Sequence, residues 1–335
     1  MAEPSRTAGP AVLGVDSGGS GLRLAVAPVA APHARPETLY ASDTPVRTGE
    51  RGIDARHLLD QLLPAAEKLR QTVGVSGFAA VCVGAAGMAT LGQDLRAALP
   101  RALADAFGVR DLALATDAVT GYAGALGQRP GVVVAAGTGL VALGADPASG
   151  DGWRRADGWG HLLGDCGGGA WIGRAGLEAA LRAHDGRPGG SPALLRAAEE
   201  QFGPVSGLPG QLYPRADRPA VLASFAPYVA REAAGDAVAA GIVREAAEQI
   251  ADTAAAACPP GPGRAVALTG GLFRLGEVLR APVRAGLAAR LPDAVCAEPD
   301  GGPLDGALRL AAALATDTVR LPVDGTLLRL VHHGR

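Results

Sequence analysis

The chain has 335 residues, of which 48% are hydrophobic and 19% are charged. These proportions indicate a folded globular protein with room for two domains and exclude a long disordered chain. The formal net charge is −2, and residues 1–10 contain no apolar core. We therefore expect no nucleic-acid partner and no signal peptide. No apolar run reaches about 18 residues, so we expect no membrane span either.

The cysteines lie far apart in the sequence, and no two of them form a CxxC pair. They are Cys82, Cys166, Cys258 and Cys296. This spacing argues against a zinc or iron–sulfur site and favours a reducing compartment. The sequence therefore predicts a cytoplasmic protein.

A glycine-rich hairpin is predicted over Val12–Val26. One apolar run ends at Asp16, the turn Gly18-Gly19-Ser20 follows, and a second apolar run begins. Backbone N–H groups of such a turn, with a serine hydroxyl, can bind phosphate oxygens. Asp16 at the strand end can hold a hydrated Mg²⁺. The turn matches neither a Walker A loop nor a dinucleotide fingerprint, and an ordinary hairpin remains an equal alternative.

Further elements of the first half follow in the order strand, helix, strand, helix, strand. We expect them at Thr38–Ala41, Asp54–Val73, Phe78–Gly84, Gln93–Phe107 and Leu112–Thr116. Asp54 is the predicted N-cap of the first helix, because apolar residues recur behind it at helical spacing. The whole order, three strands and then two helix–strand pairs, is that of an actin-like (ribonuclease H-like) domain.

The second half begins in the same way, about 120 residues later, which is a weak internal repeat. A strand at Gly131–Ala136, the turn Gly137-Thr138-Gly139 and a strand at Leu140–Asp146 predict a second hairpin. Helices are then expected at 170–183, 192–202, 220–235 and 237–257. A strand at Ala265–Thr269 leads to Gly270-Gly271, and two helices follow at 276–291 and 303–315.

One segment carries a specific resemblance. Residues 158–173 read GWGHLLGDCGGGAWIG and resemble the GWGHxxGDEGS segment of the N-acetylglucosamine kinase family, within the BadF/BadG-type ATPases of the actin-like superfamily. Further segments fall in the family's order: the first hairpin, Thr116-Asp117-Ala118, Ala136–Gly139, Glu232–Asp236 and Thr269-Gly270-Gly271. The resemblance covers about residues 12–315. It implies an α/β protein of two actin-like domains with a central cleft, at 11–117 and 118–302, with a helix at about 303–320 that packs back on the first.

The resemblance also implies the roles of single residues in phosphoryl transfer from ATP to a sugar. Both glycine turns, Gly18-Gly19-Ser20 and Gly137-Thr138-Gly139, match positions that hold the ATP phosphates, and Gly270-Gly271 matches the adenosine end. Asp16 matches the Mg²⁺ region. Asp117 matches the catalytic aspartate, which accepts the proton of the sugar 6-hydroxyl. The sugar contacts implied are Asp117, Gly158, Trp159, Gly160, His161 and Asp165.

For three of these residues a purely structural role remains an alternative. Asp117 precedes an apolar stretch that can be helical, so it can be an N-cap. Trp159 can be a core aromatic residue, and His161 a buried histidine whose hydrogen bonds are satisfied.

Two departures from the family pattern bear on the substrate. Where kinases for the N-acetylated sugar carry GTGSN, this chain has Leu140-Val141 after the glycine turn, and Cys166 replaces a glutamate. An acid, Asp157, precedes the signature, and Glu178 lies on the following helix. Loss of acetamide-binding groups and gain of a carboxylate suit a free ammonium group. We therefore expect glucosamine as substrate, with N-acetylglucosamine as the alternative; Asp157 as an exposed loop acid also stays open.

A different class of function shares the fold, namely ATPases that activate a partner enzyme through an iron–sulfur cluster at a subunit interface. The scattered cysteines do not match that arrangement. A non-catalytic sugar sensor is a third possibility, against which the intact Asp117 argues. Dimers are common in the family, so a homodimer is a further expectation of the resemblance.

Overall fold

The computed structural model describes residues 9–18, 21–32, 39–42, 44, 48–49, 52–88 and 92–332. Contacts between residues divide the chain into two compact units. Unit 1 comprises the described residues of 1–130, 145–153 and 299–335, and unit 2 comprises 131–144 and 154–298. The expected domain ranges 11–117 and 118–302 remain a prediction.

Unit 1 is built on a six-stranded sheet of order β13-β7-β6-β1-β2-β3. Its strands are β1 (Ala11–Gly18), β2 (Gly21–Pro28), β3 (Leu39–Ser42), β6 (Ala80–Ala85), β7 (Asp111–Thr116) and β13 (Leu328–His332). Strands β1, β6 and β7 are parallel, whereas β2, β3 and β13 are antiparallel to their neighbours. A separate two-stranded pair joins β4 (Thr48–Gly49) to β5 (Gly52–Ile53). The predicted first hairpin is confirmed as β1–β2.

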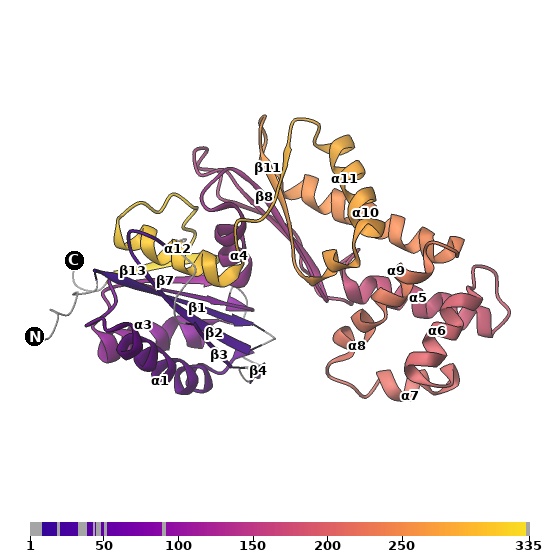
Figure 1. The fold of residues 1–335 in the computed structure, drawn as a ribbon, viewed down its shortest axis with the longest axis horizontal. Helices are drawn as coiled ribbons and strands as arrows, with labels where there is room; N and C mark the ends of the chain where they lie inside the picture. The colour runs from indigo at the N-terminus through magenta and orange to yellow at the C-terminus, as the bar shows by residue number, and fades with distance from the viewer. Residues whose placement is uncertain are drawn as a thin grey trace, which may run out of the picture. The chain divides into compact units, whose positions relative to one another are not determined.

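Two pairs of helices cover the two faces of this sheet (Figure 1). They are α1 (Ala55–Val73) with α3 (Gln93–Phe107), and α4 (Asp117–Leu126) with α12 (Pro303–Ala315). Alternation along β1 explains the arrangement, because Leu13 and Val15 join the core with α1 and α3, and Gly14 faces Leu308 of α12. Asp54 caps α1 as predicted, since its carboxylate accepts the N–H groups of residues 56 and 57.

Helices α4 and α12 approach each other backbone to backbone. A Cβ atom on Gly306 would lie 1.8 Å from the carbonyl oxygen of Thr120, and one on Gly124 would lie 2.0 Å from that of Gly302. No side chain fits at either position without moving the helices apart. Glycine is therefore required for this packing.

Unit 2 is built on a five-stranded sheet of order β10-β9-β8-β11-β12. Its strands are β8 (Gly131–Ala136), β9 (Leu140–Ala145), β10 (Trp153–Asp157), β11 (Ala265–Thr269) and β12 (Val295–Ala297). Numbered along the chain within each sheet, the order 3-2-1-4-5 occurs in both units, with β13 added at one edge of the first. This repeated order confirms the predicted actin-like α/β fold class.

The helices of unit 2 are α5 (Gly169–His184), α6 (Pro192–Phe202), α7 (Leu208–Leu212), α8 (Arg218–Ser224), α9 (Ala226–Glu232), α10 (Ala237–Ala257) and α11 (Glu277–Arg290). Short 3₁₀ turns lie at Val205–Gly207 and Gly271–Leu275. The predicted single helix over 220–235 is wrong, because the chain breaks at Phe225 between α8 and α9. Pro227 has no N–H to bond the carbonyl of residue 223, and Phe225 is fully buried.

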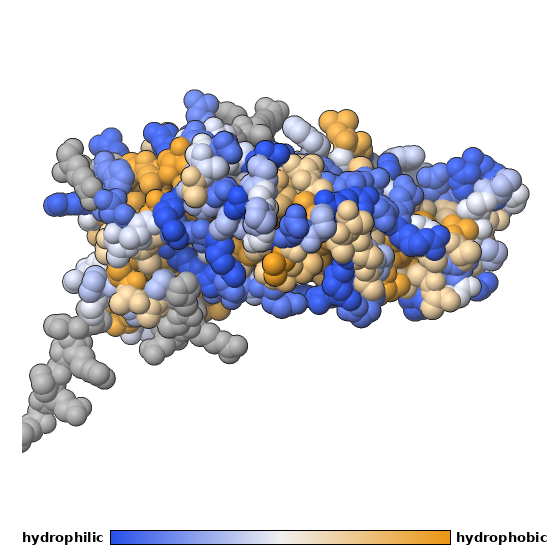
Figure 2. Space-filling view, turned by 90° about the horizontal axis from the view of Figure 1, so that it is seen from above, coloured by the Kyte–Doolittle hydropathy of each residue, from blue (hydrophilic) through white to orange (hydrophobic). Residues whose placement is uncertain are grey.

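The surface agrees with the composition. The face drawn in Figure 2 is mostly hydrophilic, with hydrophobic residues in small groups between hydrophilic ones. Within the described part of the chain, every helix is too short or too polar to cross a membrane.

Candidate active site

Unit 1 holds the two candidate acids at the carboxyl ends of parallel strands. Asp16 lies near the end of β1 and is only 3% exposed. It faces Arg23 across the hairpin, with 2.7 Å between Oδ2 and Nη2. Burial raises the pKa of Asp16 and the charge of Asp117 raises it further, whereas Arg23 lowers it. The carboxylates of Asp16 and Asp117 therefore lie close enough to interact.

Asp117 is the first residue of α4 and is exposed. The N-cap of this helix is Thr116, whose Oγ1 accepts the N–H of Val119 at 3.3 Å. The N-cap alternative for Asp117 is therefore wrong. Because α4 follows β7, Asp117 lies at the same sheet edge as the end of β1, where α/β sheets commonly bind ligands.

The carboxylate oxygens of Asp16 and Asp117 are ligands of the kind that Mg²⁺ prefers. Mg²⁺ in nucleotide enzymes keeps several waters and binds one or two carboxylates together with phosphate oxygens. Asp16 supplies such an oxygen, and two neighbouring carboxylates favour a divalent cation. Among the described residues no group of three His, Cys, Asp or Glu side chains forms a metal site, so a bound ion would depend on phosphate and water for its other ligands. Arg23, which the sequence did not single out, competes for Asp16.

The first glycine turn is described only in part. Gly18 pairs with Gly21 at the end of the hairpin. Gly19 and Ser20 lie outside the described residues, so their predicted phosphate contacts stay predictions. The neighbouring Ser17 is 1% exposed, and its Oγ has no hydrogen-bond partner among the residues described.

In unit 2, the second glycine turn is held by the start of helix α5. The turn closes through the N–H of Gly137 on the carbonyl of Gly139 at 2.9 Å. The N–H groups of Gly169 and Ala170 then donate to the carbonyls of Gly137 and Thr138, each at 2.8 Å. These donors belong to the first turn of α5, where N–H groups lack partners within the helix. The helix therefore fixes the turn by its backbone.

Asp157 stabilises the loop of residues 158–164, which we call the signature loop. Its two carboxylate oxygens accept the N–H groups of Asp165 at 2.6 Å and of Cys166 at 3.0 Å. Asp157 and Asp165 both have positive φ, 59° and 56°, which is uncommon outside glycine but more frequent for Asp and Asn. Asp157 thus joins the two ends of the loop 158–164.

Asp165 connects this loop to the second glycine turn. Its carboxylate accepts the N–H of Gly160 at 3.1 Å and that of Leu140. A Cβ atom on Gly139 would lie 2.3 Å from Oδ2 of Asp165, so only glycine leaves room for this carboxylate. The predicted residues Gly139, Gly160 and Asp165 therefore form one connected structure.

The charge of this structure is negative. Burial raises the pKa of Asp165 and the charge of Asp157 raises it further, whereas the two N–H donors and His161 lower it. Among the described residues, no arginine or lysine lies within ion-pairing distance of either carboxylate. The site could therefore bind a small cationic group.

Trp159 projects into solvent. It is 69% exposed, with the Arg155 guanidinium 5.3 Å from its ring centre. The core alternative for Trp159 is therefore wrong, whereas His161 is half-buried. The adjacent Leu162 and Leu163 are also exposed, so this loop presents an apolar surface that its sequence alone did not reveal.

The remaining predicted residues of unit 2 differ in their relation to this site. Gly270 directly follows β11 and has φ of 100°, and a Cβ there would lie 2.1 Å from the carbonyl oxygen of Ala136, directly before the glycine turn. Glu178 is exposed on α5 and bonds Arg182 at 2.9 Å. Unit 1 contains Asp16, Gly18 and Asp117, and unit 2 contains the other described site residues.

The sequence and the fold of this chain are both similar to those of known proteins. Residues 13–290 match the BadF/BadG/BcrA/BcrD ATPase family. An N-acetylmuramic acid/N-acetylglucosamine kinase of Clostridium acetobutylicum is 26% identical over 177 residues, which cover 52% of this chain and 55% of that protein. The match thus spans about half the length of that relative.

Two crystal structures of candidate N-acetylglucosamine kinases share the fold. The protein from Chromobacterium violaceum is 29% identical with a TM-score of 0.64, over 91% of this chain and 99% of that one. The protein from Porphyromonas gingivalis is 17% identical with a TM-score of 0.66, over 92% of this chain and 100% of that one.

Proposed function

Because this chain belongs to the BadF/BadG/BcrA/BcrD ATPase family, we propose that it is an ATP-dependent sugar kinase that phosphorylates the 6-hydroxyl of an amino sugar. The names of the relatives from C. acetobutylicum and C. violaceum support the sugar class. The observation that carries the proposal is the connected structure of Gly139, Gly160 and Asp165, because it joins a glycine turn of the kind that binds phosphate to the loop 158–164, whose backbone and carboxylate groups can bind sugar hydroxyls.

The chemistry requires a base beside the attacking hydroxyl and donors on the phosphates. Asp117 is exposed at the end of β7, where it can accept the hydroxyl proton as the oxygen attacks phosphorus. Backbone N–H groups of the glycine turns bind phosphate oxygens. Mg²⁺, held through Asp16, supplies charge neutralisation for the phosphates when bound.

Glucosamine is the proposed substrate, and N-acetylglucosamine is the alternative. Leu140 and Val141 replace the residues that bind the acetamido group in the kinases of this family for that sugar. Asp157 and Asp165 place two carboxylates together without an arginine or lysine partner among the described residues, which suits an ammonium group. Both oxygens of Asp157 already accept backbone N–H groups, so Asp157 supplies charge and braces the loop at the same time. Glu178 is the weaker candidate, because it already pairs with Arg182.

A sugar panel in one coupled assay tests the proposal. Release of ADP should depend on sugar, and kcat/KM should be highest for glucosamine. Asp157→Asn should lower kcat/KM for glucosamine roughly 10–150-fold more than for glucose, because a charge-assisted hydrogen bond is worth about 1.5–3 kcal/mol. Asp151→Asn, an exposed acid of the preceding loop, is the control.

The outcomes separate the alternatives. Preference of the parent for N-acetylglucosamine would remove the ammonium proposal and leave the kinase. If Asp157→Asn lowers kcat/KM equally for glucosamine and glucose, Asp157 only stabilises the loop 158–164 and does not recognise the ammonium group. ADP release without any sugar would favour an ATPase that serves a partner protein.

A further inference from the structure

The chain passes between its two units four times, at residues 130–131, 144–145, 153–154 and 298–299. On the unit 1 side, all four connecting segments contact the C-terminal half of α4 or residues held by it. The anchoring contacts described next are all between atoms of unit 1. All four segments that connect the two units therefore contact the short helix α4 or residues that α4 holds.

Tyr122 of α4 holds three of these segments. Its side chain is fully buried, and its hydroxyl lies 2.6 Å from the carbonyl oxygen of Arg129 and 3.1 Å from that of Ala145. The single hydroxyl proton can be donated to either oxygen. The ring meets Trp153 edge-on, with centres 5.4 Å apart. Trp153 itself donates from Nε1 to the carbonyl of Pro322 at 2.8 Å.

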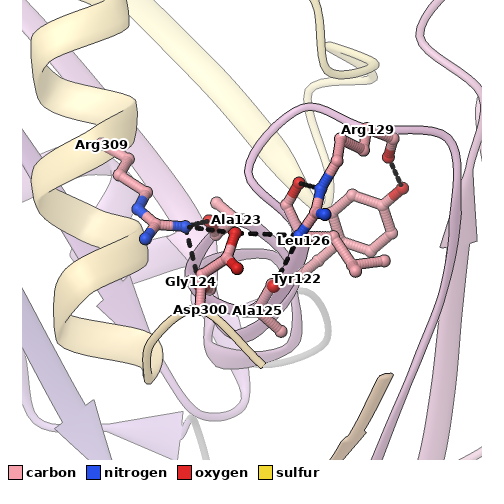
Figure 3. Close-up of polar contacts among 8 residues, drawn as sticks. All are labelled: Tyr122, Ala123, Gly124, Ala125, Leu126, Arg129, Asp300 and Arg309. Atoms are coloured by element: carbon pink, nitrogen blue, oxygen red, sulfur yellow. Dashed lines mark hydrogen bonds and ion pairs between the residues drawn. The ribbon is translucent and has the colours of Figure 1, made fainter. Parts of the chain in front are cut away.

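The fourth segment is held beside them through Asp300 (Figure 3). The N–H of Asp300 donates to the carbonyl of Ala125 at 3.0 Å, and its carboxylate pairs with Arg129 at 2.8 Å. Arg309 of α12 lies 3.7 Å from the same carboxylate and donates to the carbonyls of Ala123 and Gly124. Arg129 and Arg309 therefore join the first and fourth segments to the end of α4.

The same helix begins with Asp117, the proposed base. Asp117 and Tyr122 are five residues apart, which is about 7.5 Å along a helix axis. Both residues lie on the ten-residue helix α4, whose backbone packs closely against α12. We therefore expect a displacement of the connecting segments to change the position of Asp117.

We propose that Tyr122 is a positioning residue: its hydroxyl fixes two of the connecting segments, at Arg129 and Ala145, to α4 and so sets the position of Asp117 for proton acceptance. This inference rests on the proposed kinase function only for the role of Asp117. The anchoring of the segments stands on the contacts alone.

Tyr122→Phe tests the role with little change of shape. The ring and its contact with Trp153 remain, whereas the hydroxyl bonds are lost. We expect kcat to fall roughly tenfold, because small misplacements of a catalytic group are costly. The KM for sugar and ATP should stay within about twofold, since no substrate contact is removed.

Tyr228→Phe is the matched control. This tyrosine of α9 in unit 2 stacks on Phe225 at 5.5 Å, and its hydroxyl makes no hydrogen bond among the described residues. Its loss should leave kcat and KM unchanged. If Tyr122→Phe lowers the melting temperature and leaves kcat within twofold of the parent, Tyr122 is only structural and the inference is overturned.

Hydrogen exchange provides a readout that does not need activity. In Tyr122→Phe, amides near residues 129–131 and 144–146, where the carbonyl bonds of the hydroxyl are lost, should exchange faster than in the parent and in Tyr228→Phe. Unchanged exchange at these segments overturns the anchoring. A parent that phosphorylates no sugar refutes the proposed function instead, and the exchange result alone then decides whether Tyr122 anchors the segments.

Discussion

The two units share a strand order but hold their glycine turns by different means. In unit 1 the hairpin strands carry an ion pair between the buried carboxylate of Asp16 and the exposed side chain of Arg23. In unit 2 the turn carries no charge, and backbone N–H groups of α5 donate hydrogen bonds to its carbonyls. The carboxylate of Asp165 packs against Gly139 of this turn. The difference shows that the repeated strand order places each glycine turn at the end of a strand but does not determine which groups surround the turn. The groups attached to those ends differ, because unit 1 carries the carboxylates of Asp16 and Asp117, whereas unit 2 carries a turn fixed by backbone hydrogen bonds beside Asp165.

The largest effect should come from the acid of unit 1. Asp117→Asn keeps the shape and removes proton acceptance, so kcat should fall about 10²–10⁴-fold while sugar binding survives. Steady-state kinetics and calorimetry measure the two quantities. Asp105→Asn, an exposed acid of α3, is the control. Turnover of the Asp117 variant within threefold of the parent would exclude Asp117 as the base.

The next effect should come from the turn of unit 2. Gly139→Ala places a methyl group against the carboxylate of Asp165, whereas a Cβ on Gly137 meets nothing within 4 Å. We expect Gly139→Ala to raise the KM for sugar and for ATP by roughly 10–100-fold, because the turn and the signature loop move together. The control is Gly210→Ala on α7, where a Cβ also meets nothing within 4 Å, and it should change neither value by more than about twofold. Equal behaviour of the two variants would contradict the coupling of turn and loop.

A third pair of variants compares two positions on α4 in unit 1. Gly124→Ala forces a methyl group onto the carbonyl of Gly302, whereas a Cβ on Gly121 meets nothing within 4 Å. Gly124→Ala should lower the free energy of unfolding by about 1–3 kcal/mol. Gly121→Ala should raise it by about 0.5–1 kcal/mol, since alanine favours a helix. Urea unfolding followed by circular dichroism measures both, and a stabilised Gly124→Ala would refute the close packing.

The smallest effect is a change of titration in unit 2. Burial and the charge of Asp157 raise the pKa of Asp165, so the folded protein keeps this proton to a higher pH than the unfolded chain does. The resulting contribution to stability is present below the unfolded pKa and is lost as pH rises through the folded one. Asp157→Asn removes one raising cause, so the midpoint of Asp165 should move down. Carbon-13 NMR of the carboxyl group measures it, and an unmoved midpoint would show that Asp157 exerts no charge effect there.

Much of the fold follows from local patterns in the sequence. The β1–β2 hairpin, the cap at Asp54 and the helix over 237–257 depend on neighbouring residues, and the structure confirms them. The edge strands β10, β12 and β13 were missed, because short strands that are paired on one side only have little apolar pattern. The break at Phe225 was missed because Ala-rich helical spacing concealed the effect of Pro227.

Most of the contacts that the candidate site residues make could not be predicted from the sequence. The order of the glycine turns and the signature indicated where Asp117, Asp157 and Asp165 belong in the chain. The two hydrogen bonds that Asp157 accepts depend on positive φ at residues 157 and 165, and the amino-acid sequence does not directly indicate these backbone angles. The partner of Asp16, Arg23, was accessible from the hairpin register, since the two residues face each other across the turn.

The return of the C-terminal segment to unit 1 has a consequence for protein synthesis. Helix α12 covers β1, and β13 pairs with β7, so the first sheet lacks both elements until residues near 332 leave the ribosome. At about 5–20 residues per second, the roughly 200 residues after Pro130 take about 10–40 s to translate. During that interval the apolar face of β1 and β6 is open to chaperones, while unit 2, most of which is contiguous, can already fold.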